Sequence, residues 1–245
     1  MDSRISQIDI KTALSAIADL VMPRVCVVCG RNLIPQESDI CIPCLAELPE
    51  THYFKMSRNP MADKLNEKVD DIRYCYASAL FFYNSESPYK NIPQALKYRR
   101  NFSAGRRFAA MLGSRLNGSD LFRDVDLVIP VPLSRKRRWE RGYNQAEVIA
   151  REVASVLGVE LDCNILKRKR DTRTQTRLSV SEKAENVRGA FEIRRGFTVR
   201  TVKHILLVDD VFTTGATTAE CHRTLRTVFG PGTRISVASL AFVSN

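Results

Sequence analysis

Hydrophobic positions change their spacing along the first half of the chain. Between residues 4 and 22 apolar side chains recur every three or four positions, which predicts an amphipathic helix that Pro23 ends. Residues 72–83 are rich in aromatic and apolar side chains and predict a strand. Residues 88–118 show helical spacing, with an expected break near Asn101.

From about residue 125 onward, apolar runs alternate with helical patterns. The predicted strands are residues 125–131, 204–210 and 234–243. The predicted helices cover Ala146–Leu157, with Asn144 as N-cap, and Thr218–Phe229. Alternation of this kind is typical of a parallel α/β sheet, in which ligands bind beyond the carboxyl ends of the strands.

The most informative stretch is HILLVDDVFTTGATT, in which a strand is followed by two acids and a Thr/Gly loop that opens a helix. Backbone amides at a helix start form an anion site, glycine permits a close backbone approach, and threonine hydroxyls add donors. The predicted phosphate-binding residues are Thr213, Thr214, Gly215, Ala216 and Thr217. Asp209 and Asp210 can accept hydrogen bonds from the vicinal hydroxyls of a ribose and can offer oxygen ligands to magnesium.

Other sites share parts of this pattern. Phosphoacceptor domains place paired acids after an apolar strand but do not need the TTGATT that follows here. A Walker phosphate loop needs Gly-Lys-Ser/Thr, and this loop has no lysine. Simple strand-turn-helix packing also uses a glycine and some threonines. The combination of acids and loop favours a phosphorylated sugar.

VDDVFTTGATT resembles the phosphoribosyl pyrophosphate (PRPP) motif of type I phosphoribosyltransferases. Two further stretches, Pro130–Glu147 and Thr174–Phe191, and a cysteine segment near the start resemble the ComF family of competence-associated bacterial proteins. The resemblance covers most of the chain. It implies an α/β fold with a type I phosphoribosyltransferase-like parallel sheet flanked by helices.

The resemblance also implies roles for individual residues. It assigns Asp209 and Asp210 to the ribose, the threonine loop to the 5-phosphate, and the loop Leu133–Arg138 to pyrophosphate. An active enzyme would release pyrophosphate from C1 of PRPP with magnesium, and a lid over residues 167–183 would exclude water. The lid candidates are Arg173, Arg177 and Lys183. The family further implies DNA uptake in natural transformation, with competence helicase machinery as a partner.

Four of the seven cysteines have the spacing C-x2-C-x11-C-x2-C. Paired knuckles of this kind predict a closed, structural zinc site on Cys26, Cys29, Cys41 and Cys44. Disulfides are the alternative, but an expected cytoplasmic location keeps thiols reduced. Cys75, Cys163 and Cys221 stand in apolar contexts and are expected in the core. We predict two domains: a helix and zinc module over residues 1–50, and the α/β domain over 51–245.

The net charge of +11 is concentrated in one region. Residues 131–200 carry 17 Lys/Arg against 9 Asp/Glu, which suggests an anionic partner. Within this region aromatic residues interleave with the candidates for pyrophosphate or nucleic-acid binding, which are Ser134, Arg135, Lys136, Arg137, Arg138 and Arg141. Such interleaving suits single-stranded DNA, yet the same cations suit pyrophosphate.

Two functions therefore stay open from the sequence. One is a phosphoribosyltransferase whose acceptor is not readable. The other is a non-catalytic module that binds single-stranded DNA or senses a ligand through a retained phosphoribosyl site. No membrane span is expected, since no stretch approaches about 18 uninterrupted apolar residues.

Overall fold

A computed structural model describes residues 23–169, 187–198 and 201–243. The helix predicted over residues 4–22 and the lid candidates Arg173, Arg177 and Lys183 lie outside these described residues. The chain divides into two compact units, Met1–Leu48 and Pro49–Asn245.

The described part of the first unit is a cysteine-bearing segment with little regular structure. Its backbone turns back on itself through a bridge between Val25 and Asn32, and Gly30 takes a φ of 76° at the turn between them. This left-handed conformation favours glycine, as expected for a tight knuckle. A short helix, α2 (Ile42–Ala46), follows the third cysteine.

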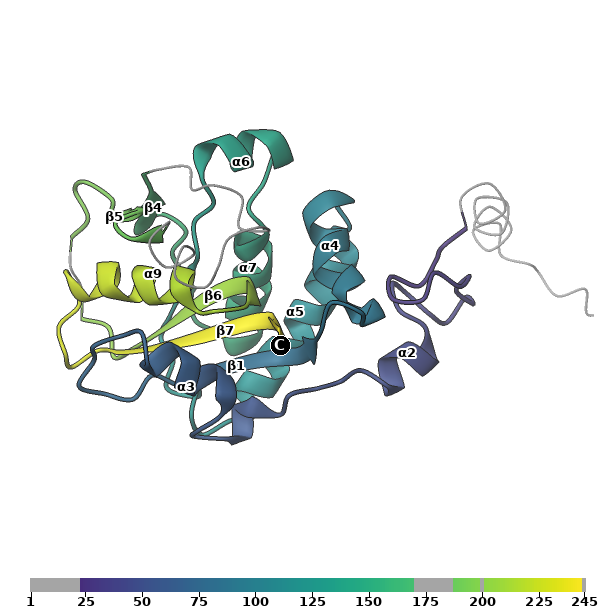
Figure 1. The fold of residues 1–245 in the computed structure, drawn as a ribbon, viewed down its shortest axis with the longest axis horizontal. Helices are drawn as coiled ribbons and strands as arrows, with labels where there is room; N and C mark the ends of the chain where they lie inside the picture. Colours follow the sequence, from purple (N-terminus) through teal and green to yellow (C-terminus); the bar gives the residue numbers. More distant parts are fainter. Residues whose placement is uncertain (1–22, 170–186, 199–200, 244–245) are drawn as a thin grey trace, which may run out of the picture. The chain divides into compact units, whose positions relative to one another are not determined.

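The second unit is built on a five-stranded, wholly parallel sheet with strand order β1-β7-β6-β2-β3 (Figure 1). The strands are β1 (Ala77–Tyr83), β2 (Leu127–Pro130), β3 (Glu160–Leu161), β6 (His204–Phe212) and β7 (Arg234–Val243). The apolar runs that predicted strands form the middle of the sheet, and they are buried because helices cover both of its faces. The predicted parallel α/β fold is confirmed.

Within the described residues, two helices cover each face of the sheet. Helices α5 and α7 pack against each other and against β1, β7, β6 and β2, whereas α3 and α9 pack against β1 and β6. Figure 1 shows α3 and α9 in front of the sheet and α5 and α7 behind it. The α-helices that the structure describes in this unit are α3 (Pro60–Asn66), α4 (Asn91–Tyr98), α5 (Phe102–Asn117), α6 (Arg135–Arg141), α7 (Gln145–Leu157) and α9 (Ala216–Arg226). A two-stranded antiparallel sheet, β4 (Leu166–Arg168) and β5 (Phe191–Ile193), lies beside them.

Most predicted boundaries agree with the structure. The helical region over 88–118 breaks where expected, since α4 ends at Tyr98 and the side chain of Asn101 caps α5. Asn144 caps α7 by accepting a hydrogen bond from the Ala146 amide. The strand predicted over residues 72–83 begins only at Ala77, because the preceding residues form a turn in which Ile72 is exposed.

Two expectations were wrong. Leu133–Arg138 was expected to be a loop, but most of it belongs to α6, which begins after the cap Ser134. Cys163 was expected in the core and is only partly buried, whereas Cys75 and Cys221 are buried as predicted. Among the described residues, no helix is both long and apolar enough to cross a membrane.

Candidate functional site

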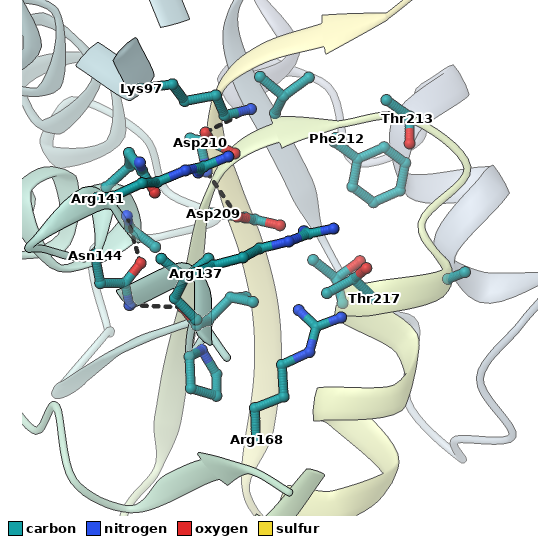
Figure 2. Close-up of a pocket in the computed structure, with 18 of the residues that line it drawn as sticks. Lys97, Arg137, Arg141, Asn144, Arg168, Asp209, Asp210, Phe212, Thr213 and Thr217 are labelled. Carbon is teal, nitrogen blue, oxygen red and sulfur yellow. Dashed lines mark hydrogen bonds and ion pairs between the residues drawn. The ribbon is translucent and has the colours of Figure 1, made fainter. Parts of the chain in front are cut away.

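A pocket of about 570 Å³ lies at the carboxyl edge of the sheet in the second unit. Its walls come from the end of β6 and the loop into α9, the end of β2, and from α4, α6 and β4 (Figure 2). The polar residues that line it include Lys97, Arg137, Arg141, Asn144, Arg168, Asp209, Asp210, Thr213 and Thr217. The pocket is thus where ligands bind in parallel α/β folds.

The two acids lie at the centre of this pocket. The Asp210 amide donates a 2.8 Å hydrogen bond to Oδ1 of Asp209, and Oδ2 of Asp210 lies 2.7 Å from Nζ of Lys97. Burial, reinforced by the neighbouring charge of Asp210, raises the pKa of Asp209 to about 7. Removal from water lowers the pKa of Lys97, but the charge of Asp210 outweighs this effect and the net pKa is raised. The Asp210 carboxylate is therefore paired with one ammonium group, which also interacts electrostatically with Asp209.

The predicted phosphate loop lines the same pocket from Thr213 to Thr217. Gly215 is the N-cap of α9, with a φ of 77° and no side-chain cap on the helix start. The Thr218 hydroxyl turns back to donate to the Gly215 carbonyl at 3.0 Å. The helix therefore presents its amino end, with its partial positive charge, to the pocket.

Only some of the basic side chains of helix α6 line the pocket. Arg137 and Arg141, one turn apart, line the pocket. Figure 2 shows Arg137 extending into the pocket toward the side formed by the threonine loop. These two arginines are the members of the predicted basic segment that join the acids.

The other members of that segment lie elsewhere. Ser134 is buried and caps α6 by accepting a hydrogen bond from the Arg137 amide. Arg138 forms an ion pair with Glu147 at 2.9 Å. Arg135 and Lys136 are exposed and do not line the pocket. Residues that are adjacent in sequence therefore face different surroundings, because a helix turns each one by about 100°.

Two cations of the pocket were not among the predicted site residues. Lys97 comes from α4, more than 100 positions before the acids, and Arg168 comes from β4. The guanidinium of Arg168 lies over the ring of Phe191, 5.2 Å from its centroid, and Figure 2 shows it pointing into the pocket from below. No local pattern marked Lys97, whereas Arg168 lies within the lid predicted over residues 167–183, whose first two residues belong to strand β4 instead of a loop. Lys97 is the basic residue in the last turn of α4, and a basic residue at a helix end does not by itself indicate a site.

The acid pair fits a directly bound magnesium ion only in part. Carboxylate oxygens are suitable ligands for magnesium, but one oxygen of Asp210 is engaged by the Lys97 ammonium. One of the two carboxylates is therefore only partly available to a magnesium ion.

The four cysteines of the first unit form a compact cluster. Their Sγ atoms all lie within 4.8 Å of one another, and those of Cys29 and Cys41 are 3.8 Å apart. Tetrahedral zinc with bonds of about 2.3 Å separates its sulfur ligands by about 3.8 Å. Burial alone would raise the pKa of Cys41, but hydrogen bonds from the Cys44 amide and from the Arg31 side chain lower it to about 6, whereas burial and the neighbouring thiols raise the pKa of Cys44. The cluster fits a metal that binds thiolates.

A second group of titratable side chains lies in the second unit, away from the pocket. His222 Nε2 is 2.8 Å from Oδ2 of Asp71 and 3.4 Å from Sγ of Cys75. The same Asp71 oxygen accepts two hydrogen bonds from Arg226, at 2.9 and 2.6 Å. Since a guanidinium already occupies the carboxylate, we interpret this group as a buried ion-pair network between α9 and the turn before β1.

Comparisons with known proteins agree with this geometry. Residues 144–241 match the phosphoribosyl transferase domain family. Competence protein F of Haemophilus influenzae is 32% identical over 142 residues, which cover 57% of this chain and 62% of that protein. A DNA utilization protein of Salmonella typhi, YhgH, is 38% identical over 95 residues, covering 39% of this chain and 40% of that protein. The chain therefore spans less than two thirds of these two relatives.

A third relative is covered more fully. Competence protein ComFC of Streptococcus pneumoniae is 33% identical over 167 residues, which cover 65% of this chain and 69% of that protein. The acids and the threonine loop lie within the matched transferase domain, whereas Lys97, Arg137 and Arg141 lie before it. On the strength of these matches, the chain belongs to the ComF family of phosphoribosyltransferase-like proteins.

Proposed function

We propose that the pocket binds the phosphoribosyl group of PRPP or a related ligand. The 5-phosphate lies on the loop Thr213–Thr217, and Asp209 and Asp210 accept hydrogen bonds from the ribose hydroxyls. The observation that carries this proposal is the presence of the acid pair and the amino end of α9 in one pocket. Backbone amides and a helix dipole bind phosphate, and adjacent carboxylates suit a vicinal diol.

The cations of the pocket suit the rest of the ligand. Arg137, Arg141 and Arg168 supply positive charge for a diphosphate, and magnesium accompanies that group as its counter-ion. In a transferase these charges stabilise the departing pyrophosphate while positive charge develops on the sugar. In a ligand sensor the same contacts bind PRPP without bond cleavage. Both hypotheses share the phosphoribosyl site.

Calorimetry with PRPP and magnesium tests the shared site. The double substitution Asp209→Asn and Asp210→Asn should weaken binding about 10-fold or more, because hydrogen bonds to charged groups contribute about 1.5–3 kcal/mol. Asp120→Asn is a matched control, since the Asp120 side chain is 87% exposed and outside the pocket. Equal PRPP affinity in the wild type and the double variant would exclude the proposed site. Release of pyrophosphate from bound PRPP would then separate the enzyme from the sensor.

We also propose that the cysteine cluster holds one structural zinc ion. All four ligands come from the protein, so the site is closed to substrate. Cys26 and Cys41 are buried, and the carboxylate of Glu37 accepts hydrogen bonds from the Ile34 and Ile42 amides beside them. Zinc would stabilise a unit that has little regular structure of its own.

A second candidate function is binding of single-stranded DNA on the outward side of α6. Trp139 is 88% exposed there, in a helix where Arg135 and Lys136 are exposed as well. Exposed aromatics stack on bases and basic side chains contact phosphates. Relatives of this chain are named competence and DNA utilization proteins, which supports a role in DNA uptake.

The DNA site can be tested apart from the pocket. Arg135→Gln with Lys136→Gln should lower the slope of log affinity against log salt by about 1.4, at about 0.7 per phosphate contact on single strands. Trp139→Ala should weaken binding by about 1–3 kcal/mol. PRPP affinity should stay unchanged in these variants, because none of the three residues lines the pocket. An unchanged salt slope would exclude this face.

A further inference from the structure

Lys97 reaches the acid pair from a helix that lies before the matched transferase domain. Helix α4 buries Ile92, Ala95 and Leu96 and packs against α5. The hydroxyl of Tyr143 donates a hydrogen bond to the Leu96 carbonyl, one residue before the lysine. A lysine on a helix held by these contacts is pre-organised rather than a mobile surface side chain.

The ammonium group of Lys97 faces a concentrated negative charge. Its Nζ lies 2.7 Å from Oδ2 of Asp210, and the two side chains are only 24% and 12% exposed. Asp209 and Tyr83 also interact electrostatically with it. An ion pair with this little exposure is screened less than a surface pair, so removal of one partner leaves a poorly compensated charge.

A divalent cation that bound the acid pair directly would compete with this lysine. Such a cation would share the Asp210 carboxylate with the ammonium group, which already occupies Oδ2, and would lie within a few ångströms of it. Like charges a few ångströms apart in a partly buried pocket repel strongly. The geometry therefore opposes occupation of both sites at once.

We propose that Lys97 is the resident counter-ion of Asp210 and excludes divalent metal from the acid pair. It is a positioning residue that orients the Asp210 carboxylate toward the sugar hydroxyls. On this basis the site binds a sugar phosphate without metal at the sugar, and magnesium enters only on a diphosphate. The statement about the sugar rests on the proposed function, whereas the exclusion of metal does not.

A purely structural role for Lys97, in which its ion pair only links α4 to β6, makes a different prediction. Removal of a structural ion pair lowers the stability of the fold but gives the acid pair no new affinity for metal. Removal of a counter-ion frees a carboxylate pair that binds a hard cation. Metal affinity and thermal stability, measured on the same variants, therefore distinguish the two roles.

The test uses Mn²⁺ alone as the probe, followed by electron paramagnetic resonance of the full chain. Lys97→Met should bind Mn²⁺ at least about 10-fold more tightly than the wild type, which corresponds to about 1.4 kcal/mol. Adding Asp210→Asn to this variant should abolish the gain, which assigns the ion to the acid pair. Lys90→Met, just before α4 and outside the pocket, is the matched control and should behave as the wild type.

Equal Mn²⁺ affinity in the wild type and Lys97→Met, both folded by circular dichroism, would overturn the proposal. If Lys97→Met does not fold, Lys97→Gln keeps a hydrogen-bond donor without the charge and carries the same test. A gain that persists with Asp210→Asn would also overturn the proposal, because the ion would then lie elsewhere.

Ribose 5-phosphate separates this inference from the proposed function. The wild type should bind it by calorimetry with equal affinity in magnesium and in a chelator. Binding that requires magnesium would overturn the role given to Lys97. No binding under either condition would contradict the proposed phosphoribosyl site, while the Mn²⁺ comparison would still decide whether Lys97 excludes metal.

Discussion

Gly215 lies directly against the ring of Phe212. A Cβ atom placed on Gly215 would be 2.6 Å from Cζ of Phe212, and the glycine has a φ of +77°. The sequence suggested that this glycine lets the backbone approach a phosphate. The structure adds two requirements inside the protein itself, a left-handed backbone and contact with a buried aromatic ring.

We predict that Gly215→Ala destabilises the protein whether or not a ligand is present. The left-handed backbone costs about 1–2 kcal/mol for a residue with a Cβ, and overpacking against the ring adds about 1–3 kcal/mol. Urea unfolding measures the sum. In a double-mutant cycle, Phe212→Leu should recover part of the overpacking cost, whereas strictly additive losses would show that the two residues do not couple.

A Gly215 variant could lose binding because the protein is destabilised, so this loss does not by itself identify a phosphate site. Thr217→Val tests the phosphate site more directly. It keeps the shape of the side chain and removes one hydroxyl that lines the pocket. We expect the affinity for ribose 5-phosphate to fall about 10-fold, because a hydrogen bond to a charged group contributes about 1.5–3 kcal/mol. Thr227→Val, at the other end of α9, serves as the control in calorimetry. Equal losses in both variants would contradict a specific role for Thr217.

We predict one zinc ion per chain and its loss when Cys44 is replaced. With about 10–16 kcal/mol of binding free energy shared among four thiolates, Cys44→Ser should weaken zinc about 100-fold and expose the first unit to proteases. Metal analysis and limited proteolysis measure both effects. Cys163→Ser, outside the cluster, should keep the metal. A metal-free protein with these four thiols in disulfides would contradict the prediction.

Stability should fall between neutral and mildly acidic pH because of His222. Burial lowers the pKa of this side chain to about 4, although Asp71 opposes the shift, while Arg226 and Arg223 add to it and the thiol of Cys75 faces the same nitrogen. The folded state therefore favours neutral histidine, and the unfolded chain, with a pKa of about 6.5, takes up the proton first. This contribution is complete above about pH 6.5 and is lost as the pH falls toward 4.

When the pH is lowered from 7.5 to 5, the protonation of this histidine in the unfolded chain should reduce the free energy of unfolding by about 2 kcal/mol. Urea unfolding of the wild type and of His222→Gln at both values isolates this effect, because all other titrating groups are shared. The variant should lose about 2 kcal/mol less than the wild type over this interval. Parallel losses in the two proteins would contradict the prediction, because they would mean that His222 has the same pKa in the folded and unfolded states.

Local patterns were sufficient for much of the fold. The apolar runs of β2, β6 and β7 predicted buried strands because each strand is covered on both faces. Asn144 was recognisable as a cap because its partner, the Ala146 amide, is two residues away. The acid pair and the threonine loop were also readable, since all of their members fall within nine consecutive residues.

The sequence by itself determined the parallel α/β class, the four-cysteine cluster and the acids with their loop, because each depends on groups close together in the chain. Only the tertiary structure decided which cations join them. Lys97 meets Asp210 through the packing of α4. Arg137 enters the pocket while its neighbour Arg138 pairs with Glu147, because the expected loop is a helix. Contacts of this kind depend on how the helices pack in the folded protein, and the spacing of residues along the chain does not specify that packing.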